Sequence, residues 1–188
     1  MKKLFFGVFA MAIFSFASSN VSAQMMKSDN PMVGGAAMYK TKNIVENAVN
    51  SADHTTLVAA VQAAGLAETL SGKGPFTVFA PVNSAFTALP AGTVETLLKP
   101  ENKATLTKIL TYHVVAGNMD SKAIAKAIKK GNGTATFTTV AGGKLMAMMN
   151  GNTLVLTDEK GGTSRVTIAD VRQSNGVIHV VDTIVMPS

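Results

Sequence analysis

Helical patterns in the first two thirds of the chain and strand patterns in the last third predict an α+β fold. Between residues 44 and 130, apolar residues recur three and four positions apart, as on one face of a helix. From residue 134 onward the apolar period changes to two, which is typical of strands. Glycine-containing turns separate these strands at Gly142–Gly143, Asn150–Asn152, Gly161–Gly162 and Asn175–Gly176. An antiparallel meander is therefore expected in the last third, joined by one strand from the first half.

The first elements of the chain are predicted to be a secretory signal peptide over residues 1–23 and a flexible tail over residues 24–37. Lys2 and Lys3 precede a short apolar core, and small residues before Gln24 favour cleavage there. The apolar core is shorter than the roughly 20 residues that cross a bilayer, so no stable membrane span is expected. The tail contains a proline, two adjacent glycines and no apolar period. Residues 38–188 are left to form a single domain.

Short helices dominate the first part of this domain. One is expected from Ile44 to Val49 with Thr41 as its N-cap, and another from Leu57 to Ala64, ended by Gly65. A longer helix is predicted from Pro100 to Thr111, because proline suits the first turn and Leu106, Ile109 and Leu110 share a face. Asp120 is expected to cap a further helix, which ends at Gly131.

Two strands are predicted to lie in the interior of the sheet. Residues 76–80, FTVFA, form an apolar run that Pro81 ends, and Asn83 is then expected to cap a short helix. Phe79 and Phe86 are expected to fill the core. Residues 177–186 are apolar on both faces, which also indicates an interior strand.

Composition limits the chemistry that the protein performs. The chain has no cysteine, which excludes disulfides, thiol catalysis and cysteine-ligated metals. The formal net charge is +6, and about +4 remains without the two leader lysines, a value that argues only weakly for an anionic partner. The protein is expected to be exported from a bacterial cell and to reside in the periplasm, the medium or the outer cell surface.

Three segments together resemble the fasciclin domain family: GPFTVFAPVNSAF at residues 74–86, LTYHVVAG at 110–117 and SNGVIHVVDTIVMP at 174–187. The resemblance spans roughly residues 37–188. It implies a fasciclin-like wedge of two β-sheets with several short helices packed along one side. It also implies a non-enzymatic protein of extracellular adhesion and matrix interaction. The residues expected to be the structural signature are Phe79, Pro81, Asn83, Phe86, His113, Asn175, Gly176 and His179.

No catalytic or metal-binding constellation is predicted, and no cofactor. A serine hydrolase would need a G-x-S-x-G elbow, which is absent, and Ser84 stands at a helix start where a small polar residue is expected. The three histidines do not have metal-ligand spacing. His54 is expected at the surface, and His179 in the core with hydrogen-bonded ring nitrogens. His113 is interpreted as a structural residue whose ring ties two segments together by hydrogen bonds. The alternative is that it belongs to a surface that binds a partner.

Candidate partner residues are Tyr112 with His113 and a row of lysines. Of these two residues, Tyr112 is the one expected to be accessible to a binding partner, since tyrosine is favoured at interfaces. Four lysines share one helical face: Lys122, Lys126, Lys129 and Lys130. They form either a solvated face or a patch for an anionic polysaccharide, phospholipid headgroups or an acidic protein. Nucleic acid is not expected, because no basic stretch is interleaved with aromatic residues.

Two functions remain open. The first is an exported adhesion or interaction module that binds a protein or glycan at the cell surface or in the matrix, with a role in attachment or biofilm formation. The second is a carrier of a small apolar ligand, such as a lipid or pigment, for which Met146 and Met148 could line an adaptable groove.

Overall fold

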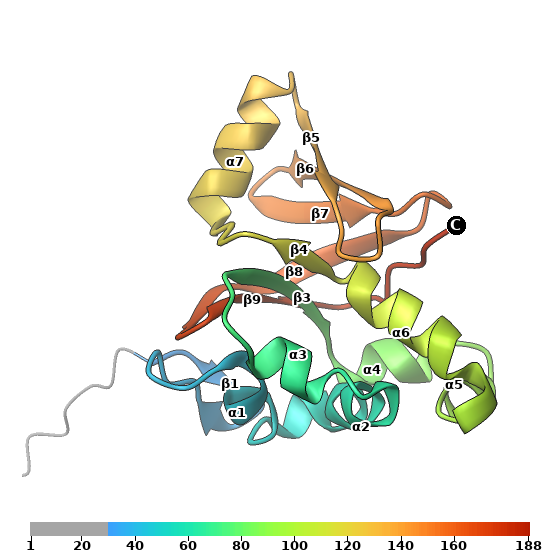
Figure 1. Cartoon of the computed structure of the whole chain (residues 1–188). Coiled ribbons are helices and arrows are strands. Elements are labelled where there is room, and N and C mark those ends of the chain that lie inside the picture. Colours follow the sequence, from blue (N-terminus) through green and yellow to red (C-terminus); the bar gives the residue numbers. More distant parts are fainter. Residues whose placement is uncertain (1–29) are drawn as a thin grey trace, which may run out of the picture.

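A curved sheet forms the centre of the protein and short helices cover it (Figure 1). The computed structural model describes residues 30–188, and in this part of the chain seven strands pair in the order β4-β3-β9-β8-β7-β6-β5. Their bounds are β3 Phe76–Pro81, β4 Val114–Ala116, β5 Thr134–Thr138, β6 Lys144–Asn150, β7 Thr153–Thr157, β8 Thr163–Gln173 and β9 Gly176–Val181. The α+β class and the antiparallel meander from β5 to β9 are confirmed.

The long strand β8 belongs to both halves of the sheet. Its first residues pair with β7, where Val155 lies opposite Arg165, and the remainder pairs with β9. Register shifts between Val166 and Val171 bend the strand between these two partners, as bulges do. The halves β5-β6-β7 and β9-β3-β4 thus diverge from β8, which gives the predicted wedge of two sheets. The edges approach each other again where Val115 of β4 bridges to Thr139.

The strand from the first half of the chain joins the sheet as predicted. β3 pairs in parallel with β9 along its whole length, from Phe76 opposite Gly176 to Pro81 opposite Val181. Every residue of β9 is buried, which confirms the interior position of this strand. The strand ends at Val181, however, and does not continue to Met186 as predicted. Gly176 has no room for a side chain, because a Cβ there would lie 2.0 Å from the Phe76 carbonyl oxygen.

The helices divide into two groups that cover different parts of the sheet (Figure 1). The first group comprises α1 Ile44–Ala48, the 3₁₀ turn Ala52–His54, α2 Thr55–Ala64, α3 Ala67–Ser71, α4 Asn83–Thr87, α5 Thr93–Leu97, the 3₁₀ turn Pro100–Asn102 and α6 Lys103–Tyr112. Its buried side chains form one apolar core with β3 and β9. The single helix α7, Ser121–Lys130, forms a second core with β5, β6 and β7. None of the helices in the described part is long and apolar enough to cross a membrane.

The prediction of a flexible tail over residues 24–37 is wrong for its last residues. β1 Met32–Val33 and β2 Ala36–Ala37 pair as a small antiparallel sheet. Val33 is only 4% exposed and belongs to the first core, and the Gly34 carbonyl accepts a hydrogen bond from the Ala52 amide. Burial of Val33 therefore orders a stretch whose glycines suggested freedom. The predicted signal peptide and residues 24–29 lie outside the described residues.

Two predicted helix caps are replaced by others. Asn43, not Thr41, caps α1: its side chain accepts from the Glu46 amide while the Glu46 carboxylate accepts from the Asn43 amide. Asn83 is the first residue of α4 and does not cap it. Its side chain instead accepts from the Thr56 amide at 3.0 Å and so caps α2. Asp120 and Gly131 bound α7 as predicted.

Asn175 joins three elements through one side chain, so its loss should be costly. Its amide nitrogen donates to the Leu70 and Gly72 carbonyls, and its oxygen accepts from the Ile44 amide. Asn175→Ala is expected to lower the free energy of unfolding by about 2 kcal/mol, because three backbone groups, two of them in the buried residues Ile44 and Leu70, lose their hydrogen bonds. Urea denaturation would measure this, with the exposed Ser174→Ala as control. A change no larger than the control's would contradict the assignment.

Candidate interaction surface

The Tyr112–His113 pair lies inside the protein. His113 is 3% exposed, and its Nε2 accepts from the Val185 amide at 3.2 Å. Nδ1 must then carry the proton, which it donates to the Ile109 carbonyl at 2.9 Å. Burial lowers the pKa of His113 to about 4, so the ring is neutral at pH 7. His113 fastens the end of α6 to the C-terminal segment.

Tyr112 is fully buried, with 0% exposure, so the prediction that it is accessible to a binding partner is wrong. Its hydroxyl donates to the Lys144 carbonyl at 2.6 Å and accepts from the Glu159 amide at 3.3 Å. Burial raises the pKa of Tyr112. The ring belongs to the second core and not to the surface.

Removing the Tyr112 hydroxyl should therefore affect stability and not binding. Tyr112→Phe keeps the ring but leaves the Lys144 carbonyl and the Glu159 amide without their partner. We expect the free energy of unfolding to fall by about 1 kcal/mol, measured by chemical denaturation. Retained stability together with weakened attachment to a partner would contradict the structural role.

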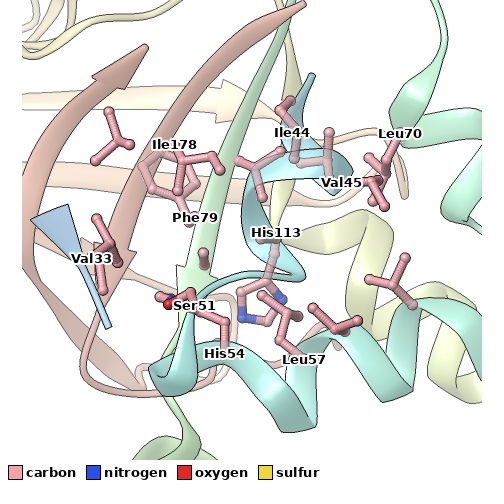
Figure 2. Close-up of a pocket in the computed structure, with 18 of the residues that line it drawn as sticks. Val33, Ile44, Val45, Ser51, His54, Leu57, Leu70, Phe79, His113 and Ile178 are labelled. Atoms are coloured by element: carbon pink, nitrogen blue, oxygen red, sulfur yellow. The ribbon is translucent and has the colours of Figure 1, made fainter. Parts of the chain in front are cut away.

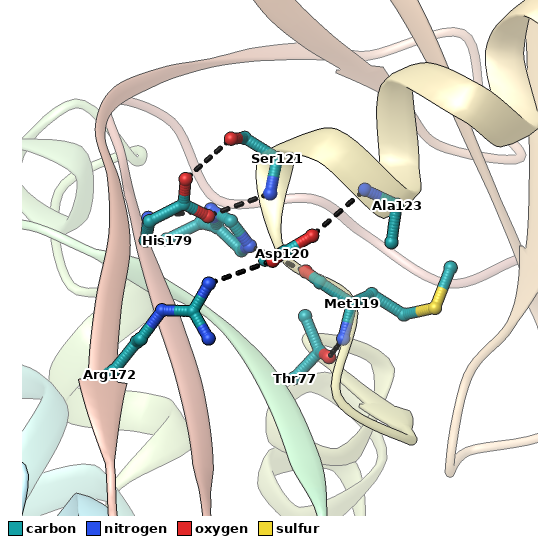
Figure 3. A network of polar contacts seen from close by, with 8 residues as sticks. Thr77, Met119, Asp120, Ser121, Ala123, Arg172 and His179 are labelled. Carbon is teal, nitrogen blue, oxygen red and sulfur yellow. Dashed lines mark hydrogen bonds and ion pairs between the residues drawn. The ribbon is translucent and has the colours of Figure 1, made fainter.

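His179 holds the segment that leads into α7 (Figure 3). Its Nδ1 accepts from the Asp170 amide at 3.4 Å, so its Nε2 proton is donated to the Met119 carbonyl at 2.9 Å. The ring is fully buried and stacks on Phe79, with centroids 5.6 Å apart. The Met119 amide donates to Thr77 Oγ1 at 2.9 Å. The prediction of a hydrogen-bonded core histidine is confirmed.

Two carboxylates fix the first turn of α7 (Figure 3). Asp120 accepts from the Ala123 amide at 2.9 Å and pairs with Arg172 at 2.8 Å. Asp170 accepts from both the amide and the hydroxyl of Ser121. The backbone of Asp170 has a φ of +61°, a left-handed conformation that is uncommon outside glycine. The start of α7 is therefore held by contacts from β8 as well as by its own cap.

The lysine face of α7 is exposed to solvent. Ile124 and Ile128 are buried against the strands, while Lys122, Lys126, Lys129 and Lys130 are all exposed. α7 carries no acidic residue, and in residues 30–188 the single ion pair is the one between Arg172 and Asp120. Each four-residue step along the helix rises about 6 Å, which spaces the ammonium groups along one row. This row of lysines, which have no ion-pair partner in the described residues, is the strongest candidate for an interaction surface.

A small cavity lies in the first core between the helices and β3 and β9 (Figure 2). Its volume is about 60 Å³, and its lining is almost entirely apolar. His54 lies at its wall and is 3% exposed, so the prediction that His54 is a surface residue is wrong. Its Nδ1 contacts Ser51 Oγ at 2.9 Å, and burial lowers its pKa although the Ala80 carbonyl and Asp53 act in the opposite direction.

The residues and the size of this cavity differ from those of a serine hydrolase site and of a typical ligand pocket. Ser51 is itself buried, and among residues 30–188 His54 Nε2 has no hydrogen-bond partner, so no carboxylate in this part of the chain orients the ring as in a serine hydrolase. Ligand pockets usually measure about 300 to 1,000 Å³, several times the volume found here. Within the described residues, no three His, Asp or Glu side chains gather as metal ligands.

Comparisons with known proteins agree with the fold and the sequence motifs. A sequence model of the Fasciclin domain matches residues 52–187. The chain belongs to the fasciclin domain family. Protein sll1483 of Synechocystis is 48% identical over 158 residues, covering 83% of this chain and 79% of the relative. Immunogenic protein MPB70 of Mycobacterium bovis is 31% identical over 202 residues, covering 94% and 96%.

The fasciclin fold is also found in a solved structure. A FAS1 domain pair from the insect cell adhesion molecule Fasciclin I superposes with a TM-score of 0.68 at 15% sequence identity. The match covers 76% of this chain and 50% of the solved chain, so this chain spans about half of that pair. Among these matches, Fasciclin I is described as a cell adhesion molecule.

Proposed function

We propose that this protein is an exported, non-enzymatic interaction module that binds a protein or glycan at the cell surface or in the extracellular matrix. The main support for this proposal is the lysine face of α7. Its four exposed ammonium groups have no ion-pair partners in the described residues, and the helix that bears them is anchored. Such a face attracts an anionic partner and orients it. Its sites of action would be the periplasm, the medium or the outer cell surface.

The buried histidines support a binding role over a chemical one. All three rings are enclosed, and His113 and His179 have both nitrogens occupied by backbone groups. A general base must reach the proton that it removes, and neither ring has a nitrogen left to do so. These residues are expected to position the backbone and not to react.

A role as carrier of a lipid or pigment is the alternative with less support. The cavity of about 60 Å³ is far smaller than such a ligand, and Met146 and Met148 lie on the exposed side of β6, apart from it. A ligand would have to separate the helices from β3 and β9, exposing the first core. Native mass spectrometry of protein from its own source is expected to show the unliganded mass, and a reproducible bound apolar mass would revive this alternative.

The interaction function can be tested in cells. Disrupting the gene is expected to reduce attachment to surfaces or biofilm formation, and the wild-type gene should restore it. A variant with Lys122, Lys126, Lys129 and Lys130 all changed to Gln should fail to restore it. The control changes four exposed lysines outside α7 to Gln: Lys40, Lys99, Lys103 and Lys160. Unchanged attachment of the disrupted strain across several surfaces would count against the function itself.

A further inference from the structure

A groove runs along the first half of α7, between the helix and the strands β7 and β8. Its volume is about 450 Å³, several times that of the buried cavity, and it opens to solvent. Lys122 and Ala125 line its helical side, and Met149, Leu154 and Val166 line its strand side. Three polar residues, Ser121, Asn152 and Thr167, also line it. One member of the lysine face thus borders a groove in which apolar side chains lie beside polar ones.

The groove has the make-up of a peptide-binding site. Met149 is 43% exposed, although large apolar side chains are usually withdrawn from water, and its flexible thioether adapts to different shapes. Interfaces of this kind combine an apolar centre with a charged rim. Ser121, Asn152 and Thr167 also line the groove and can hydrogen-bond to polar groups of a partner. Met149, Leu154 and Val166 offer no hydrogen bonds, so they favour a partner that brings an apolar side chain to this part of the groove.

The groove is also held in place before any partner arrives. Asp170 and Asp120 fix the first turn of α7, where Lys122 begins the lysine face. Ile124 anchors the next turn in the second core. Because these contacts order the site in advance, a partner would not have to supply the free energy of ordering it.

We propose that this groove binds an extended acidic peptide segment of a partner protein. An aromatic or branched aliphatic side chain of the peptide would occupy the space beside Met149 and Leu154. Carboxylates on either side of it would pair with Lys122 and with Lys126 one turn further along. This inference rests on the proposed function and narrows the partner from a protein or glycan to a protein with an acidic, apolar segment.

A phage-displayed library of random dodecapeptides tests the proposal. It would be panned on the purified protein and depleted on a Met149→Asp variant. The enriched peptides are expected to carry acidic residues next to an aromatic or branched aliphatic residue. A synthetic copy of one such peptide, measured by fluorescence anisotropy, should bind at least about tenfold more weakly to Met149→Asp and to Lys122→Glu, a loss of about 1.4 kcal/mol each.

Two matched variants serve as controls. Met146→Asp makes the same change on the opposite side of β6, and Lys99→Glu makes the same charge reversal away from α7. Both are expected to bind the peptide within about twofold of the wild type, a difference well under the 1.4 kcal/mol of a tenfold effect. An empty selection, enriched peptides without this composition, or equal losses in the controls would overturn the proposal.

A polygalacturonate probe separates this inference from the proposed function. If polygalacturonate binds the wild type and Met149→Asp equally, loses affinity with Lys122→Glu, and no peptide is enriched, the partner is a polyanionic glycan. The peptide proposal then fails while the interaction function stands. If neither probe binds and gene disruption leaves attachment unchanged, the proposed function fails as well.

Discussion

Acidification from pH 7 to pH 4 is expected to lower the free energy of unfolding by about 3 kcal/mol through His113 alone. Burial holds the pKa of His113 at about 4 in the folded protein, against 6.5 for an unperturbed histidine. Between these values the unfolded chain binds more protons than the folded one. Stability is therefore unaffected above about pH 6.5 and is lost as the pH falls toward 4. Urea denaturation at a series of pH values measures the loss.

Two further groups strengthen this acid dependence. Burial also lowers the pKa values of His54 and His179, so protonation of either ring opposes folding in the same direction. Asp158, whose carboxylate partly favours protonated His113, acts against the effect without reversing it. Between pH 7 and pH 4, the free energy of unfolding of a His113→Gln variant should fall by about 3 kcal/mol less than that of the wild type. An equally steep dependence in that variant would show that other groups cause it.

Replacing His113 by alanine is expected to cost about 3 kcal/mol at pH 7. The change leaves the buried Val185 amide without its acceptor and opens a void between α6 and the C-terminal segment. An orphaned buried donor costs about 1 to 3 kcal/mol, and the void adds to that. Thermal and urea unfolding would measure the loss.

The exposed Ser84→Ala provides the control for this change. Ser84 lies in α4 and its side chain is exposed, so its replacement should change the free energy of unfolding by no more than about 0.5 kcal/mol. Normal unfolding of His113→Ala combined with lost attachment would place His113 in a partner surface instead.

Periodicity predicted the parts of the fold that depend on local pattern. Continuous apolar character placed β9 in the sheet interior, where β3 and β8 now flank it. The alternation of isoleucine and lysine predicted which face of α7 is buried. Asp120 and Gly131 predicted its ends because caps act within one helical turn.

Features that depend on distant partners could not be predicted in this way. Asn83 had the residue type of a cap, but the helix that it caps begins at Thr55, 28 residues earlier in the chain. Tyr112 has the amphipathic side chain of an interface residue, yet β6 and the loop after β7 enclose it. Asp170 gave no signal, because an aspartate in an alternating strand does not reveal a positive φ or a bond to Ser121.

We propose that the lysine face of α7 binds the partner. The most direct measurement is surface plasmon resonance of the purified protein over immobilised cell-envelope extract of the producing cell. Exposed charge pairs contribute about 0.5 kcal/mol each, so changing Lys122, Lys126, Lys129 and Lys130 to Gln should weaken binding by about 2 kcal/mol, or roughly 30-fold. Changing Lys40, Lys99, Lys103 and Lys160 to Gln should have little effect. Equal binding by the wild type and the α7 variant would contradict the claim.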